Sequence, residues 1–108
     1  MNLLFICSRN QWRSPTAEKL FDRHPCHHAK SAGTEKTARV KVNGKMLSWA
    51  DKIYVMERKH KERLMQYFPE ELKGKQLLVL DIPDEYKFMD PELIQILEAS
   101  LDNLLARY

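Results

Sequence analysis

Residues 2–15 read NLLFICSRNQWRSP, and their order of apolar, polar and helix-starting residues decides the fold. The apolar run from residue 2 to residue 7 is short and ends abruptly in polar residues, which is typical of a buried β-strand. Ser14-Pro15 then predicts a helix start, with Ser14 as the N-cap and Pro15 at the first helical position. The segment therefore predicts a strand, a polar loop and a helix in immediate succession.

The alternation of strand and helix continues along the chain. Apolar and β-branched runs predict three more strands, and amphipathic periodicity predicts helices between and after them. The predicted strands cover residues 27–32, 52–56 and 76–82, and the predicted helices cover residues 38–50 (interrupted near Asn43-Gly44), 59–68, and a last one from Asp90-Pro91 with Leu93, Ile94, Leu97, Leu101, Leu104 and Leu105 inward. This order predicts an α/β fold: one domain over residues 1–108, built on a parallel four-stranded sheet with helices on both faces.

The charge, the apolar runs and the cysteine content exclude several classes of protein. The formal net charge of +3 suits anionic ligands but does not by itself indicate nucleic acid. No apolar run is long enough to span a membrane, and the first residues lack the order of a signal peptide, so we expect a cytoplasmic protein without a membrane partner. The spacing of the His and Cys residues is unlike that of a zinc site, and neither metal nor cofactor is expected.

Cys7 and Arg13 frame the predicted loop between the first strand and the first helix. Ligands of such sheets bind at the carboxyl ends of the strands, where Cys7 stands. The intervening residues can curl so that their N–H groups face one point, and the helix N-terminus adds positive partial charge there. This field stabilises a thiolate, and the planar guanidinium of Arg13 can hold two phosphate oxygens. Ser14 can donate to the sulfur of Cys7. The pattern predicts a phosphate loop with a cysteine nucleophile.

These residues resemble a known family. Cys7 to Ser14, followed by Pro15 and Ala17-Glu18, is similar to the phosphate loop of low-molecular-weight protein tyrosine phosphatases, and Ser31-Ala32-Gly33 and residues 50–60 resemble the neighbouring strand regions. The resemblance implies hydrolysis of a phosphomonoester through a cysteinyl-phosphate, with Cys7 as nucleophile, Arg13 as phosphate clamp, Asn10 holding the loop and Ser14 contacting the sulfur. The residues it implies for substrate binding are Ser8, Arg9, Asn10, Gln11, Trp12, Ser14 and Tyr86.

The family also uses an aspartate after the fourth strand as general acid, and two residues compete for that role. Asp90 precedes a proline, as the family's acid often does. Asp84 lies nearer the carboxyl end of the last strand, and Tyr86 supplies the expected aromatic residue. Since Asp90-Pro91 is fully explained as a helix start, we favour Asp84. A solvated turn is the structural alternative for Asp84.

Three departures from the family pattern bear on substrate choice. Trp12 stands where members often have a second cysteine, so the protective disulfide should be absent. Arg9 replaces a usual glycine and adds positive charge at the rim. The segment between Gly33 and Asp51 is shorter than in typical members, which implies a shallower pocket. Phosphotyrosine preference is therefore inherited from the resemblance alone.

Two other functions stay open. A phosphate-binding module without catalysis would recognise phosphoproteins or nucleic-acid ends through basic residues such as Arg9 and Lys41. Arsenate reduction needs a relay of cysteines, and Cys26 is the other cysteine of the chain. A cysteine at a strand end is also often a simple core residue. His60, on a charged helix, is predicted to be exposed and structural.

Overall fold

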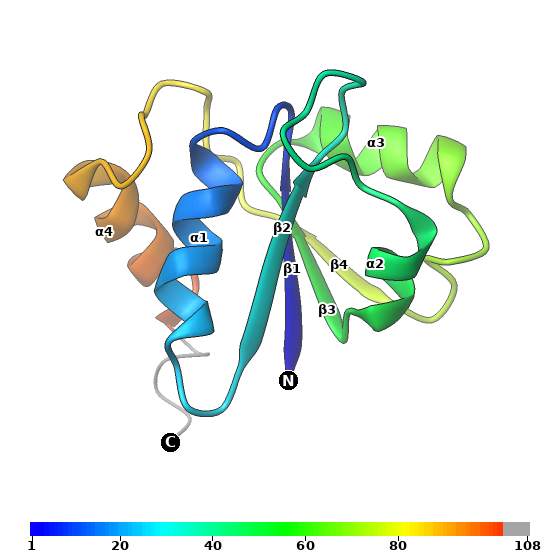
Figure 1. The fold of residues 1–108 in the computed structure, drawn as a ribbon, viewed down its shortest axis with the longest axis horizontal. Helices are drawn as coiled ribbons and strands as arrows, with labels where there is room; N and C mark the ends of the chain where they lie inside the picture. Colours follow the sequence, from blue (N-terminus) through cyan, green and yellow to red (C-terminus); the bar gives the residue numbers. More distant parts are fainter. Residues whose placement is uncertain (103–108) are drawn as a thin grey trace.

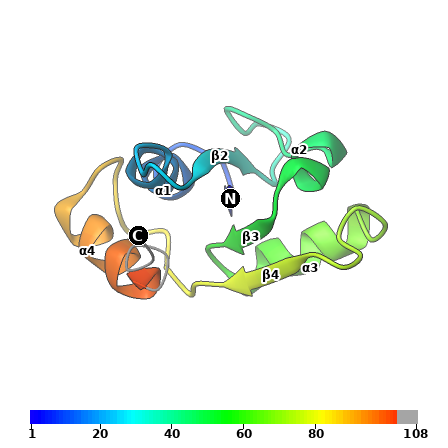
Figure 2. The ribbon, with the colours of Figure 1, turned by 90° about the horizontal axis from the view of Figure 1, so that it is seen from below.

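The computed structural model describes residues 1–102. It contains one parallel four-stranded sheet, as the sequence predicted. The strands are β1 (Asn2–Cys7), β2 (His28–Gly33), β3 (Lys52–Val55) and β4 (Gln76–Val79), in the order β2-β1-β3-β4. The helices are α1 (Arg13–Asp22), α2 (Gly44–Trp49), α3 (Arg58–Tyr67) and α4 (Pro91–Ser100). α1 and α4 cover one face of the sheet, and α2 and α3 cover the other (Figures 1 and 2).

β1 runs through the middle of the sheet and contributes to both hydrophobic cores. Leu3 and Phe5 face α1 and α4, whereas Leu4 and Ile6 face α2 and α3. The ring of Phe5 stacks between Phe21 and Tyr54, with centroid distances of 5.6 and 5.4 Å. Replacing a phenylalanine in such a position by alanine costs about 3–5 kcal/mol. This packing fixes the strand that ends in Cys7, and therefore the position of the nucleophile.

α1 begins earlier than the sequence predicts. Arg13 is its first residue, Trp12 occupies the N-cap position without a side-chain hydrogen bond, and Pro15 stands at the third position. The prediction of Ser14 as N-cap is therefore wrong, because its hydroxyl is used elsewhere. Pro15 loses no hydrogen bond, since the first N–H groups of a helix have no partner within it.

The predicted helix over residues 38–50 is only half present. α2 starts at Gly44, and Asn43 caps it by accepting from the N–H of Met46 at 2.9 Å. The residues before it are extended because they bond β2 instead: the N–H of Gly33 donates to Val40, and the N–H of Val42 donates to Gly33. Val42 is still buried, as its periodicity predicted.

α4 confirms the predicted helix start. Asp90 caps it by accepting from the N–H of Glu92 at 2.9 Å, and Pro91 is at the first position. Leu93, Leu97 and Leu101 are buried, whereas the predicted inward residues Leu104 and Leu105 lie outside the described residues. Among the helices of residues 1–102, none has both the length and the apolarity that a bilayer crossing requires.

Candidate active site

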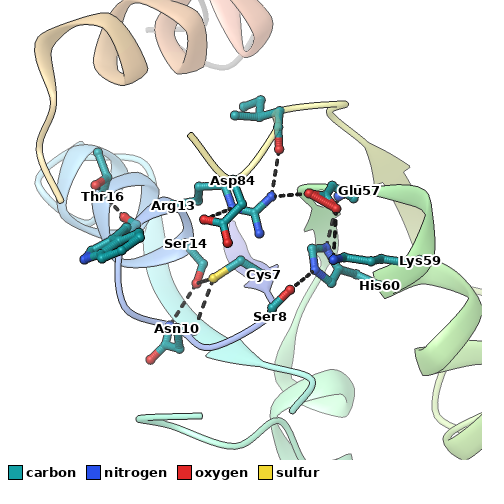
Figure 3. A network of polar contacts seen from close by, with 12 residues as sticks. Cys7, Ser8, Asn10, Arg13, Ser14, Thr16, Glu57, Lys59, His60 and Asp84 are labelled. Carbon is teal, nitrogen blue, oxygen red and sulfur yellow. Dashed lines mark hydrogen bonds and ion pairs between the residues drawn. The ribbon is translucent and has the colours of Figure 1, made fainter. Parts of the chain in front are cut away.

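The candidate site lies at the carboxyl edge of the sheet. Cys7 ends β1, and the phosphate loop (residues 7–13) leads from it into α1 (Figure 1). Glu57 follows β3, and Asp84 lies in the segment after β4. Figure 3 shows Glu57 and Asp84 reaching the guanidinium of Arg13, which lies beside Cys7.

The carbonyl groups at the start of the phosphate loop all point away from its centre. Each accepts a hydrogen bond of 3.0 Å from the segment that follows β2. The donors are the N–H of Thr34 to Cys7, the N–H of Glu35 to Ser8, the N–H of Arg39 to Arg9, and Nε of Arg39 to Asn10. The short connection between β2 and α2 therefore shapes the loop.

This arrangement turns the loop amides inward. In a trans peptide the N–H points opposite to the carbonyl of the same unit, and none of the described peptide bonds is cis. The N–H of Asn10 demonstrates the result, because it donates to the sulfur of Cys7 at 3.2 Å. Inward-facing amides beside a helix N-terminus form a concave site for an anion.

Two groups lie within hydrogen-bond distance of the sulfur of Cys7. Besides the N–H of Asn10, the hydroxyl of Ser14 lies 2.9 Å from it. The side-chain amide of Asn10 donates to Ser14 Oγ at 2.9 Å and to Ser31 Oγ at 2.8 Å. Ser14 Oγ also lies 3.3 Å from the carbonyl of Ala32, so its hydrogen has two possible acceptors, that carbonyl and the nearer sulfur of Cys7. These bonds also hold Asn10 in a left-handed conformation, with φ of 56°. These contacts fix the sulfur of Cys7 at the centre of the loop.

Arg13 is fixed before any ligand arrives. Its side chain is 2% exposed, and Nη1 donates to Glu57 Oε1 and to the carbonyl of Ile82, both at 2.8 Å. Burial opposes the charge of Glu57, but the hydrogen bond and positive charge of Arg13, with Lys59, outweigh it and hold the pKa of Glu57 below its ordinary value. An ionised Glu57 anchors the guanidinium that faces the loop.

His60 is buried, at 1% exposure, so the prediction of an exposed residue is wrong. Its Nδ1 accepts from the N–H of Glu57 at 3.0 Å, and its Nε2 lies 2.9 Å from Ser8 Oγ. Burial, together with the charge of Arg13, lowers the pKa of His60 to about 4, although Glu57 acts in the opposite direction. Glu57 and His60 link both ends of the phosphate loop, and sequence reasoning missed this. The signal in the sequence was the spacing of Glu57 and His60, which are three residues apart at the start of α3, as in a capping box.

The two candidate acids differ in position. Asp84 Oδ1 lies 3.6 Å from Nε of Arg13, and Asp84 lines the small cavity above Cys7. Asp90 caps α4. The geometry therefore favours the choice of Asp84 over Asp90, and its catalytic role stays a prediction.

The cavity at the loop is small, with a volume of about 30 Å³. It is lined by Cys7, Arg9, Gln11, Trp12, Arg13 and Asp84. Trp12 is 40% exposed at its rim. Tyr86, predicted to bind substrate, is absent from this lining and packs against the core beside α4.

Cys26 lies at the opposite edge of the sheet from Cys7. Its carbonyl accepts from the N-terminal ammonium of Met1 at 2.8 Å, and Met1 precedes the strand that ends in Cys7. A thiol relay between the two cysteines has no support in this geometry. Within residues 1–102, no three His, Cys, Asp or Glu side chains are grouped to hold a metal ion.

Comparison with known protein sequences identifies a relative of this chain. No protein-family model matches the sequence. The low molecular weight protein-tyrosine-phosphatase Wzb of Escherichia coli K12 is 30% identical over 116 aligned positions, which cover 80% of this chain and 78% of Wzb.

Solved structures share the fold. Vibrio vulnificus Wzb in complex with benzylphosphonate has a TM-score of 0.78 at 21% identity, with 99% of this chain and 98% of that chain covered. The YwlE arginine phosphatase, in a mutant form with a phosphorylated active-site serine, has a TM-score of 0.76 at 18% identity, with 99% and 97% covered.

Proposed function

The chain belongs to the low-molecular-weight protein-tyrosine-phosphatase family, and we propose from this premise that Cys7, Arg13 and Asp84 carry out its catalysis. Membership makes it a cysteine-dependent phosphoric monoester hydrolase that acts on phosphorylated substrates. The observation that carries the residue assignment is the position of the Cys7 sulfur at the centre of a loop whose amides face inward, where it accepts from the N–H of Asn10 at 3.2 Å and lies 2.9 Å from the hydroxyl of Ser14.

The first step transfers the phosphoryl group to the enzyme. The Cys7 thiolate forms an S–P bond as the P–O bond to the leaving group breaks, and the electron pair of that bond stays on the leaving oxygen. Protonated Asp84 gives its proton to that oxygen and becomes a carboxylate. The loop amides and Arg13 stabilise the charge on the equatorial oxygens, and Glu57 keeps Arg13 in place for this.

The second step releases inorganic phosphate. The Asp84 carboxylate takes a proton from water, whose oxygen attacks phosphorus while the S–P bond breaks. The electron pair returns to the sulfur of Cys7, where the Ser14 hydroxyl and the N–H of Asn10 stabilise the departing thiolate. Asp84 is protonated again and the cycle closes.

We propose protein phosphotyrosine as the substrate. One feature supports an aromatic ester: Trp12 offers an exposed ring beside the cavity on which a phenyl ring can stack. The relative Wzb is a protein tyrosine phosphatase. A cytoplasmic location suits a reduced thiol nucleophile, and we place the chain there on that ground.

Substitution of each cysteine by serine tests the nucleophile. We expect Cys7→Ser to lower kcat on para-nitrophenyl phosphate by roughly 10⁴-fold or more, because serine lacks a stabilised anionic form. Cys26→Ser is the matched control, with the same change at the other edge of the sheet, and should keep full activity. Substantial turnover by Cys7→Ser, or its loss in Cys26→Ser, contradicts the mechanism.

Substrate class needs a separate comparison. We expect the highest kcat/KM on a phosphotyrosine peptide, compared with phosphoserine and phosphoarginine versions of the same peptide and a 5′-phosphorylated oligonucleotide. The phosphoarginine arm is included because a protein of the same fold is an arginine phosphatase. A preference for any other arm would replace phosphotyrosine as the substrate and leave the roles of Cys7 and Arg13 intact.

A further inference from the structure

A second cavity lies beside the phosphate loop, next to the one above Cys7. Its volume is about 80 Å³, and it is lined by Ser8, Thr34, Glu35, Lys59, His60 and Arg63. The ion pair between Arg9 and Glu35, at 3.8 Å, links the two cavities, because Arg9 lines the first and Glu35 lines the second. The two cavities therefore lie on either side of one exposed ion pair, which places the second cavity where residues flanking a bound phosphoryl group can reach.

Ser8 brings an available donor to this cavity. The N–H of Glu57 can only donate, so Nδ1 of His60 must accept, and the proton of a neutral His60 is on Nε2. Nε2–H then donates to Ser8 Oγ, which leaves the hydroxyl hydrogen of Ser8 for another acceptor (Figure 3). The lowered pKa of His60 agrees with the neutral form. Ser8 is 7% exposed, and its hydroxyl forms no other hydrogen bond among residues 1–102.

The charges around this hydroxyl favour an anion. Lys59 and Arg63 project from successive turns of α3 into the lining. Among the described residues of the lining, Glu35 is the one carboxylate, and its charge is opposed by Arg9. Lys59 is paired with Glu57 Oε2 at 3.4 Å, just outside the lining, so Arg63 carries most of the unbalanced positive charge. A buried hydroxyl donor and cationic side chains in one lining can give charge-assisted hydrogen bonds to a carboxylate or phosphate.

An adjoining apolar cavity indicates that the anion belongs to a peptide. It has a volume of about 340 Å³ and shares Thr34 and Arg63 with the cavity at Ser8. Apolar side chains dominate it, with two lysines at its edge: Val42, Leu64, Tyr67, Phe68, Lys36 and Lys41. An acidic residue followed by an apolar one matches this sequence of surfaces, because apolar side chains line the larger cavity beside Arg63.

We propose that Ser8, Lys59 and Arg63 form a subsite for an acidic side chain that flanks the phosphorylated residue of a peptide substrate. The proposal rests on the proposed function and specifies its substrate class. Specificity of this kind arises from the arrangement of charge at the rim of a site and weakens as salt concentration rises.

Three phosphotyrosine peptides that differ only in their flanking residues test the proposal: Asp/Glu, Asn/Gln and Lys. We expect kcat/KM of the acidic peptide to exceed that of the neutral peptide by about tenfold, and the lysine peptide to be worst. Para-nitrophenyl phosphate has no second acidic group, so its turnover by the wild type checks the proposed function separately. Equal kcat/KM for the three peptides, with para-nitrophenyl phosphate still hydrolysed, overturns the subsite alone.

Two arginine variants of α3 locate the effect. Arg63→Gln should reduce the acidic-to-neutral ratio to about twofold, because it removes a cation from the lining. Arg58→Gln makes the same change on the same helix at an exposed residue outside both cavities, and should keep the ratio of the wild type. Using the ratio within each variant cancels any change in the basal rate. An equal fall in both variants, or a higher kcat/KM for a 5′-phosphorylated oligonucleotide than for the acidic peptide, contradicts the proposal.

Discussion

Two segments at the carboxyl edge of the sheet supply the groups of the proposed reaction, and they are built in opposite ways. The phosphate loop is bonded throughout: four successive carbonyls have partners, and the side chains of Ser8 and Asn10 are buried. The acid loop (residues 83–89) is open. Within residues 1–102, no backbone group of residues 83–86 forms a hydrogen bond, and the Asp84 side chain is 54% exposed.

The difference between the two loops matches their two proposed tasks, phosphoryl binding and proton transfer. Binding a doubly charged phosphoryl group profits from dipoles that are already oriented, since no reorganisation is then needed during the reaction. Proton transfer to varied leaving groups profits from an acid on a segment that can adjust its position. We therefore expect changes in the phosphate loop to impair substrate binding and turnover together, and changes in the acid loop to impair turnover alone.

The largest effect beyond loss of the nucleophile is expected at Arg13. Arg13→Lys keeps the charge but removes the planar fork, and it leaves Glu57 and the carbonyl of Ile82 without their shared partner. We expect kcat/KM on para-nitrophenyl phosphate to fall by about 10³-fold, with a higher KM as well. Steady-state kinetics with circular dichroism as a folding check measures this. Retention of a tenth of the activity would mean that the fork is not needed.

Alanine substitution at Asp84 and Asp90 separates the two loop functions. Asp84→Ala should lower kcat by about 10²-fold, with little change in KM, because proton donation is lost while the phosphate loop is intact. The loss should be greater for phenyl phosphate than for para-nitrophenyl phosphate, since the poorer leaving group needs the proton more.

Asp90→Ala is the matched control for this change. It should keep kcat and lower the free energy of unfolding by about 1 kcal/mol, because the cap of α4 is lost. Urea denaturation of both variants completes the comparison. If Asp90→Ala lost activity while Asp84→Ala kept it, the assignment of the acid would be reversed.

The features that the sequence predicted correctly depend on residues only a few positions apart in the chain. The strand ending at Cys7 and the cap at Asp90 follow from local patterns, and the structure has both. Ser14 shows the limit of this reasoning, because a serine before proline suits a helix cap equally well. Its hydroxyl is instead used by Asn10 and the sulfur of Cys7 once the loop closes.

Other parts of the site depend on distant contacts and were beyond local patterns. Glu57 reaches Arg13 because β3 pairs with β1 in a register that sets Val55 beside Ile6. The extended segment before α2 bonds β2 and the phosphate loop, which overrides the helical periodicity read from residues 38–50. Such partners become visible only when strand order and register are known.

His60 gives a prediction about stability against pH. Its pKa is about 4 in the folded protein and 6.5 when unfolded, so the unfolded chain binds more protons between these values. Stability therefore falls as pH falls through this window, by about 2 kcal/mol between pH 7 and pH 5. His60→Asn can still accept from Glu57 but does not titrate, and this part of the pH dependence should vanish. Urea denaturation at both pH values tests this. Parallel pH dependence in the two proteins would contradict it.

The smallest predicted effect compares two exposed residues. One is bonded to the phosphate loop, and the other lies in the acid loop. Nε of Arg39 donates to the carbonyl of Asn10 at 3.0 Å, whereas Glu85 follows Asp84 in the open acid loop. Arg39→Ala removes one of the four carbonyl bonds and should lower kcat/KM by about fivefold, the equivalent of one hydrogen bond. Glu85→Ala should leave kcat/KM within twofold. Equal effects would mean that the outer bonds of the phosphate loop do not set the direction of its amides, and that the contrast between the two segments lies in their side chains alone.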